Sequence, residues 1–264
     1  NEIDHLIKNF GKKTFWFSDD LFGQDHEFVK DFCNTLIDEK YNITWSVVTR
    51  ATTVPLDQLK LMKKAGCTGI SVGVESGDDT MLKVMKKDTT ADAYRMSIPK
   101  VKKILRIRGF FLIGNIGETK ESVWRTFRLI KEIKPDYGTF CPVVPLPGTE
   151  IYSQLIAMGI IDPENLNWDK FYGIDHDGNY DDESLKLTAS WCKISAEEIR
   201  NYCNYGNMLS LIVALSPIEV IKRMRRDGLR QQMKDDKDKL NRLFRYASRD
   251  PKAFLSTVKI WLTV

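Results

Sequence analysis

Hydrophobic and polar positions along residues 1–150 alternate in a way that predicts short strands separated by helices. Runs of β-branched and aromatic residues, each bounded by turn-forming residues, are typical of buried strands. The strands predicted in this way cover residues 14–17, 43–48, 70–74, 107–113 and 137–144. This serial order predicts parallel strands joined by right-handed crossovers, and five such units favour a barrel or partial barrel.

Apolar residues at helical spacing fill each gap between the predicted strands. The helices predicted from this spacing cover residues 25–40, 55–66, 78–103 and 120–134, after a helical segment over residues 1–10. Pro99 should interrupt or restart the helix in which it lies, because proline lacks the backbone N–H and its ring clashes with the preceding turn.

The pattern changes after residue 150. Residues 162–191 are rich in Asp and Asn with interspersed aromatic residues, and we interpret them as a loop. Ser195-Ala-Glu-Glu198 is a capping box, and Ser216-Pro217 is typical of the start of a helix. Residues 222–249 mix basic and acidic side chains, which we interpret as a solvated amphipathic helix pair. We therefore expect a barrel over residues 1–160 and a loop and helical region over residues 161–264.

Polar side chains follow the predicted strands at the points where those strands end. Glu75 and Ser76 come directly after the buried strand 70–74 and cannot pack into the core, so they should face water or a ligand. The other strand ends carry Asp19, Asp20, Arg50, Asn115 and Glu118. Because the carboxyl ends of parallel barrel strands carry the site, the sequence predicts one ligand pocket built from several strand ends.

Composition narrows the choice of function. The 264 residues carry a net charge of +4 and 42% hydrophobic residues, which suits one large α/β domain and gives no reason to expect a nucleic-acid partner. No apolar run approaches the roughly 20 residues that span a bilayer, and no signal-peptide pattern opens the chain, so we expect a cytoplasmic protein. The five cysteines are widely spaced, which argues against a disulfide framework and against a metal site made from these thiols.

Several separated motifs together resemble the radical S-adenosylmethionine (SAM) superfamily, in particular its branch that usually carries an upstream cobalamin-binding domain. The motifs are Phe17-Ser-Asp-Asp-Leu-Phe22, Thr49-Arg50, Ala65-Gly-Cys67, Gly73-Val-Glu-Ser-Gly77, Lys86-Lys87, Phe111-Leu-Ile-Gly114 with Gly117-Glu-Thr119, and Pro145-Leu-Pro-Gly-Thr149. The resemblance covers roughly residues 1–155, and motifs that match in order and spacing are more specific than any one alone. It implies a partial (β/α)6 TIM-like barrel in which a four-iron, four-sulfur cluster reduces SAM to a 5′-deoxyadenosyl radical.

The resemblance also implies roles for the strand-end residues. Asp19 and Asp20 occupy the position at which such enzymes hold the methionine amino group, and carboxylates suit an ammonium through charge-assisted hydrogen bonds. Glu75 and Ser76 match the strand end that contacts the SAM ribose or carboxylate. Arg50 would add positive charge near that carboxylate.

One further turn and one missing loop complete the comparison with the family. The turn with Gly114, Ile116 and Gly117 matches the backbone edge beside the adenine, where small residues permit close approach, although Ile116 stands where the family often has proline. The C-x-x-x-C-x-x-C loop that holds the cluster is missing, and so is the first strand that precedes it. We therefore expect an N-terminally truncated barrel that lacks its first strand, cluster ligands upstream of Asn1, and no activity from this fragment alone.

The enzyme implied by the resemblance would use SAM, the iron–sulfur cluster and, through an upstream domain, cobalamin. It would take electrons from a reductant such as flavodoxin or ferredoxin and act as an oxidoreductase or methyltransferase on an unidentified small-molecule or lipid-like substrate. Two other classes remain open: a different barrel enzyme with Arg50 as the clamp for an anionic substrate, and a non-catalytic binding or scaffold domain that has lost the cluster.

The same residues also permit purely structural interpretations. Asp19 and Asp20 are typical of residues that cap the following helix. Glu75 could pair with Arg50 as a rim salt bridge, and the glycines of the 114–117 turn could be ordinary turn residues. The joint pattern, rather than any single residue, favours the SAM interpretation.

Overall fold

One open sheet of five parallel strands forms the centre of the computed structural model, which describes residues 2–171, 180–249 and 251–263. The strands are β1 (Thr14–Trp16), β2 (Thr44–Val48), β3 (Cys67–Glu75), β4 (Arg106–Ile113) and β5 (Tyr137–Pro142). They lie in chain order, and each pairs in parallel with the next. Parallel strands in this order, each followed by a helix, confirm the predicted partial barrel.

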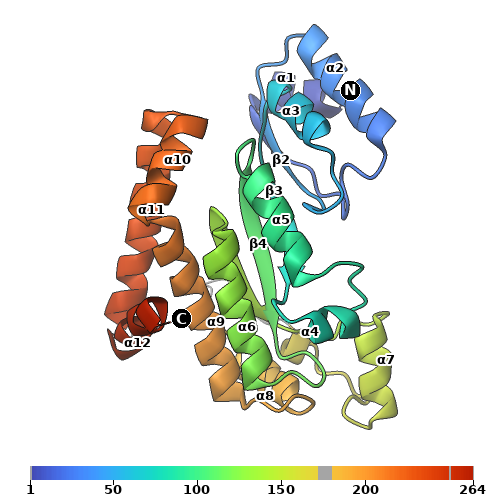
Figure 1. Ribbon diagram of the computed structural model, residues 1–264. Coiled ribbons are helices and arrows are strands. Elements are labelled where there is room, and N and C mark those ends of the chain that lie inside the picture. Colours follow the sequence, from blue (N-terminus) through green and yellow to red (C-terminus); the bar gives the residue numbers. More distant parts are fainter. Residues whose placement is uncertain (1, 172–179, 250, 264) are drawn as a thin grey trace.

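Helices connect the strands and then form a C-terminal helical region, as predicted. Their bounds are α1 (Glu2–Phe10), α2 (His26–Asp38), α3 (Leu56–Lys64), α4 (Asp79–Val84), α5 (Ala91–Val101), α6 (Lys120–Ile133), α7 (Glu150–Ala157), the 3-10 helix η1 (Trp168–Phe171), α8 (Asp182–Ala189), α9 (Ala196–Ala214), α10 (Pro217–Asp227), α11 (Leu229–Arg249) and α12 (Pro251–Thr263). Figure 1 shows α1–α3 near one end of the sheet and α10–α12 on the other side of the molecule.

Alternation along the strands separates a buried face of the sheet from a more open one. In β3, the side chains of Ile70, Val72 and Val74 are buried in the main hydrophobic core, whereas Ser71 and Gly73 on the opposite face are half-exposed. This is the period-2 pattern of a strand that packs against helices on one side only. The open face is where a ligand can reach the sheet.

The two edges of the sheet differ. The backbone N–H groups of Gly138 and Phe140 in β5 donate to Ser210 Oγ (2.5 Å) and Asn207 Oδ1 (2.8 Å) of α9, so helix side chains satisfy this edge. α9 can approach so closely because of Gly206, where a Cβ would lie 2.4 Å from the ring of Phe140. At the other edge, β1 pairs only with β2 among the described residues.

Two local predictions need correction. α5 runs through Pro99, and the interruption lies instead at residues 85–90, between α4 and α5. Pro99 sits in the last turn of α5, so the helix continues for only two residues beyond it. The loop predicted over residues 162–191 contains η1 and also α8, which Asp181 caps; residues 172–179 of that loop lie outside the described residues. The capping box at Ser195 and Glu198 is confirmed.

The charged C-terminal helices are not simply solvated, contrary to the interpretation from sequence. Arg226 of α10 forms a bidentate ion pair with the buried Asp136, with Nη1–Oδ2 and Nη2–Oδ1 distances of 3.0 and 3.1 Å. Asp136 directly precedes β5 and also accepts a hydrogen bond from the backbone N–H of Ile107 in β4. Lys239 of α11 is likewise buried, and burial lowers the pKa of its ammonium group to about 8. The basic and acidic residues therefore attach α10 and α11 to the amino end of the sheet.

No single helix in the described part of the chain is long and apolar enough to cross a membrane. Only α9 and α10 taken together reach the length and apolar composition of a membrane span among the described residues, and the two helices are bent by 68° relative to each other.

Candidate functional site

A cleft of about 540 Å³, here called the strand-end cleft, lies at the carboxyl ends of β1–β4. Asp20 reaches it from the segment after β1, Arg50 from the end of β2, and Glu75 from the last position of β3. Lys87, from the segment between α4 and α5, completes the charged groups in its wall together with Asp88. Three residues predicted from separate strand ends therefore line one cavity, which follows from the parallel arrangement.

Glu75 has an unusual backbone. Its φ of 64° lies in the left-handed region, which is uncommon for a residue other than glycine, and the register with β4 shifts between Gly73 and Glu75. Backbone strain of this kind costs on the order of 1–3 kcal/mol and is concentrated at functional sites. Its presence at the residue that carries the carboxylate into the cleft supports a ligand-binding role for Glu75.

Lys87 is the partner of Glu75. Its Nζ atom lies 3.0 Å from Oε1 of Glu75, and both side chains are partly shielded from solvent. Gly73 makes room for the pair, because a Cβ on that residue would lie 2.2 Å from Glu75 Oε1. The rim salt bridge suggested between Glu75 and Arg50 is therefore not the one that forms. The sequence marks Lys86-Lys87 as a motif, but local pattern alone indicates no role for Lys87.

Ser76 points away from the cleft. Its side chain is fully buried, its Oγ lies 3.2 Å from Oγ1 of Thr126 in α6, and it accepts a hydrogen bond from the backbone N–H of Asp78. These hydrogen bonds offset the cost of burying the Ser76 hydroxyl group, so the hydroxyl group does not need to face a ligand or water. The side chain of Ser76 therefore holds the turn between β3 and α4.

Asp19 and Asp20 differ in their position relative to the strand-end cleft. Both are exposed, but only Asp20 lines the strand-end cleft. Neither caps α2, because its N-cap is Asp25, whose Oδ1 accepts from the backbone N–H of Phe28 at 3.0 Å. The capping interpretation of this pair is therefore wrong, and Asp20 is the member placed to contact a ligand.

The 114–117 turn borders a second cavity of about 330 Å³, which shares Glu75, Lys87 and Leu112 with the strand-end cleft. Ile116 and Asn115 line this neighbouring cavity, whereas Gly114 and Gly117 do not. Gly114 has φ of 98°, and a Cβ there would lie 2.3 Å from Cγ2 of Thr188, so packing against α8 requires glycine. Gly117 also has a positive φ, with open space around it.

Glu118 stabilises this turn through hydrogen bonds to its backbone. Its Oε2 atom accepts hydrogen bonds from the backbone N–H groups of Gly114 (2.5 Å) and Asn115 (3.0 Å). Burial raises the pKa of Glu118 to about 7, although these hydrogen bonds act in the opposite direction. Glu118 is therefore a positioning residue for the turn.

The thiols of this chain do not form a cluster site. The described residues contain no group of three or more His, Cys, Asp or Glu side chains that could hold a metal ion. Burial raises the pKa of Cys33 to about 11 and that of Cys67 to about 12, which opposes the thiolate form that binds iron. An iron–sulfur cluster does not fit the donor set of the described residues.

The strand-end cleft does suit a zwitterion. It places the carboxylates of Asp20 and Glu75 in the same wall as the cationic side chains of Arg50 and Lys87. An amino-acid moiety carries one ammonium and one carboxylate, and each can form charge-assisted hydrogen bonds with groups of opposite sign. The residues present therefore fit the methionyl part of SAM.

Comparison with known proteins finds a family and several relatives. The family model of the Radical SAM superfamily matches residues 1–130. An uncharacterized methyltransferase of Pyrococcus horikoshii is 30% identical over 175 residues, which are 66% of this chain and 38% of that protein. The anaerobic magnesium-protoporphyrin IX monomethyl ester cyclase of Rubrivivax gelatinosus is 25% identical over 162 residues, covering 59% of this chain and 28% of the cyclase. The chain thus spans about a third of the length of these two relatives.

A solved structure has a similar fold. The radical SAM methyltransferase TsrM from Kitasatospora setae, with cobalamin and a four-iron, four-sulfur cluster bound, matches with a TM-score of 0.54 and 12% identity over 88% of this chain and 54% of that one. At this identity the likeness concerns the fold alone. By the motifs and the matched residues 1–130, the chain belongs to the radical SAM superfamily.

Proposed function

We propose that this chain is the SAM-binding part of a radical SAM enzyme and that SAM binds in the strand-end cleft. The observation that carries the proposal is the convergence of Asp20, Arg50 and Glu75, from three successive strand ends, on one cavity. The strained backbone of Glu75 supports the same location.

Each charged group has a distinct task in this proposal. Asp20 and Glu75 accept hydrogen bonds from the ammonium of the methionyl group, and Arg50 and Lys87 offset the charge of its carboxylate. Glu118 keeps the 114–117 turn in place, so that the backbone beside Ile116 can border the adenine. When bound, SAM would supply the radical or methyl-transfer chemistry of the superfamily.

The remaining parts of the enzyme lie outside the described residues in this proposal. The thiolates for the iron–sulfur cluster come from another part of a longer polypeptide, so that this chain alone does not turn over. Methyl transfer with cobalamin on a small or lipid-like substrate is the reaction in this proposal, and the methyltransferase relative supports the methyl transfer. Flavodoxin or ferredoxin is the expected reductant, and the cytoplasm the expected compartment.

Calorimetric titration with SAM tests the proposal on two adjacent aspartates. Asp20→Asn should weaken SAM binding by about 1–3 kcal/mol, the loss expected for a hydrogen bond to a charged group, since Asp20 lines the cleft. Asp19→Asn is the matched control and should leave the affinity unchanged. Equal losses in the two variants would contradict the assigned site. An unaltered protein that does not bind SAM at all would favour the non-catalytic scaffold alternative.

A further inference from the structure

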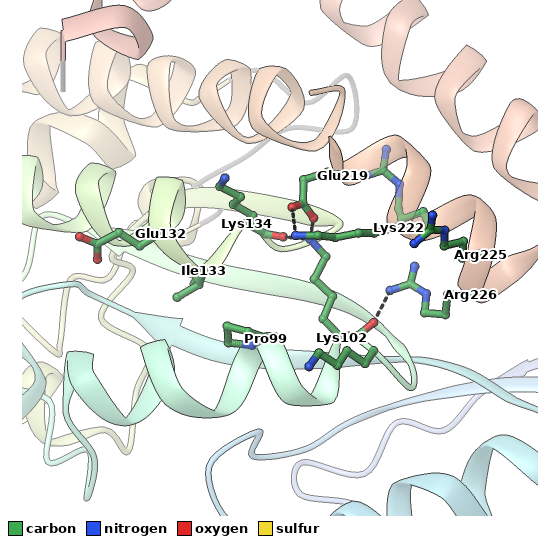
Figure 2. A pocket seen from close by; sticks show the side chains of 11 residues that line it. Pro99, Lys102, Glu132, Ile133, Lys134, Glu219, Lys222, Arg225 and Arg226 are labelled. Atoms are coloured by element: carbon green, nitrogen blue, oxygen red, sulfur yellow. Dashed lines mark hydrogen bonds and ion pairs between the residues drawn. The ribbon is translucent and has the colours of Figure 1, made fainter. Parts of the chain in front are cut away.

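A second cleft, of about 470 Å³, lies where α5, α6 and α10 meet (Figure 2). We call it the basal cleft, because Lys102 and Lys134 in its wall lie just before β4 and β5 begin, at the amino ends of the strands. The strand-end cleft lies at the carboxyl ends of the strands. The two clefts are therefore on opposite rims of the sheet.

The wall of the basal cleft is strongly cationic. Seven of its eleven residues are basic and two are acidic. The basic residues are Lys102, Lys103, Lys134, Lys222, Arg223, Arg225 and Arg226, and the acidic residues are Glu132 and Glu219. Figure 2 shows Lys102, Lys222, Arg225 and Arg226 gathered around one region of the cleft.

Both carboxylates already have partners. Glu132 accepts from Arg95, at 2.6 Å, and Glu219 interacts with Lys102 and Lys222. Arg226 is neutralised from behind by Asp136 and Asp227. These interactions attach α10 to the sheet, but they leave part of the positive charge in the wall without a counterion.

The remaining charge belongs to three side chains and part of a fourth. Lys103, Lys134 and Arg225 form no ion pair with any residue in the described ranges. Arg223 is 1% exposed; its Nε donates to Gln232 and its Nη2 to Asp236, yet its Nη1 atom is buried and has no hydrogen-bond partner among the described residues. Because that atom is itself buried, the charge that a ligand can reach in this cleft comes from Lys103, Lys134 and Arg225.

We propose that the basal cleft binds an anion that carries a phosphoryl group. A phosphoryl group has a double charge and several acceptor oxygens, which match the clustered ammonium and guanidinium donors better than a single carboxylate does. Pro99 and Ile133 add an apolar wall for the part of the ligand next to the phosphate. The cleft volume lies within the range of small-molecule sites, about 300–1,000 Å³.

Two sources carry such a phosphoryl group, a soluble phosphorylated molecule and the headgroup of an anionic lipid. The lipid source has one supporting feature: Ile218 and Ile221 of α10 are 64% and 51% exposed, close in sequence to Lys222 and Arg225. Both sources use the same cationic groups, so the same variants test them.

The test measures binding of inorganic pyrophosphate to the full protein by calorimetry. The double variant Lys103→Gln/Arg225→Gln removes two exposed cations of the basal cleft that have no ion pair to lose, so its fold should persist. The control Lys63→Gln/Lys64→Gln removes two exposed lysines at the end of α3, outside the cleft. We expect at least a tenfold loss of pyrophosphate affinity in the cleft variant, which is about 1.4 kcal/mol, and none in the control. SAM affinity should be unchanged in both.

A parallel arm identifies the source. Sedimentation with phosphatidylcholine vesicles, with and without phosphatidic acid, measures lipid binding by the same variants. Binding to phosphatidic acid vesicles that the cleft variant loses assigns the lipid source, and pyrophosphate binding alone assigns the soluble one. The proposal is overturned if neither probe binds, or if the control variant loses as much affinity as the cleft variant.

Discussion

Lys87 Nζ and Glu75 Oε1 lie 3.0 Å apart directly over the backbone of Gly73, which has no Cβ to separate them. This relationship joins the end of β3 to the segment between α4 and α5, and it sets the position of both charges in the strand-end cleft. Tyr94 of α5 also contacts this part of β3, because its hydroxyl group donates a hydrogen bond to the carbonyl oxygen of Gly73 at 3.0 Å.

Gly73→Ala should therefore impair ligand binding more than folding. The new Cβ would lie 2.2 Å from Glu75 Oε1 and 3.1 Å from Lys87 Nζ, and these flexible side-chain ends can move away at little cost to the fold. We expect SAM affinity to fall by about 1–3 kcal/mol while Tm changes little. Titration calorimetry and thermal unfolding measure the two effects. Ser71→Ala, on the same face of β3, is the control; a similar loss there would argue against a specific role for the pair.

The buried carboxyl group of Glu118 should make stability depend on pH. Burial raises its pKa in the folded protein to about 7, above the ordinary glutamate value of 4.5, so folding favours the protonated form. This stabilisation is fully present below about pH 4.5 and is lost as pH rises through 7, a decrease on the order of 3 kcal/mol in the free energy of unfolding.

Glu118→Gln should flatten that part of the pH profile, because an amide can accept the same two backbone hydrogen bonds without ionising. Urea unfolding between pH 5 and pH 8 measures the difference. The exposed Glu121, on the following helix, provides the control substitution Glu121→Gln. A profile that stays equally steep in Glu118→Gln would show that other groups cause the pH dependence.

Arg226→Met should strongly destabilise the protein. The substitution leaves the buried Asp136 without its bidentate partner, and removing one member of a buried pair costs about 3–5 kcal/mol. Arg225→Met, one position earlier in α10, removes an exposed cation and should change the free energy of unfolding by less than about 0.5 kcal/mol. Denaturant unfolding of both variants decides the matter. Equal stability would mean that α10 is attached to the sheet by other contacts.

The exposed edge of β1 should promote self-association of this chain. Trp16 is 64% exposed, and β1 has no second partner strand among the described residues. Light scattering at increasing concentration should detect association, and Trp16→Lys should reduce it, because charge on an edge strand opposes pairing. Trp168→Lys replaces another exposed tryptophan away from the edge. A monomer at all concentrations would show that β1 is protected in solution.

Sequence alone predicts the sheet well because its strands are short apolar runs whose burial depends on local pattern. It also places Asp20, Arg50 and Glu75 correctly at strand ends, since parallel order brings such ends together. The direction of a side chain after a strand is less predictable. Ser76 turns inward because Thr126, fifty residues later, offers a hydrogen-bond partner.

The buried ion pairs of α10 and α11 show the other limit. A segment of mixed charge is expected to be solvated when the sequence shows no partners for its charges. The partner of Arg226 could not be predicted, because Asp136 lies 90 residues earlier in the chain. The role of Lys87 is unpredictable for a similar reason. The sequence places residue 87 inside a continuous helix, whereas in the structure it lies in the segment between α4 and α5, from which it reaches Glu75. Partners distant in sequence, rather than local pattern, decide these positions.

Two consecutive lysines in the segment between α4 and α5 are held by different parts of the molecule. Lys87 binds Glu75 of β3, whereas Lys86 forms an ion pair with Glu150 at the start of α7. The Lys86–Glu150 pair is largely exposed, with side chains 72% and 54% accessible, and lysine side chains are flexible. A ligand carboxylate could therefore draw Lys87 away from Glu75 while Lys86 stays paired with Glu150. Each lysine of the pair thus serves a different cavity wall independently of its neighbour.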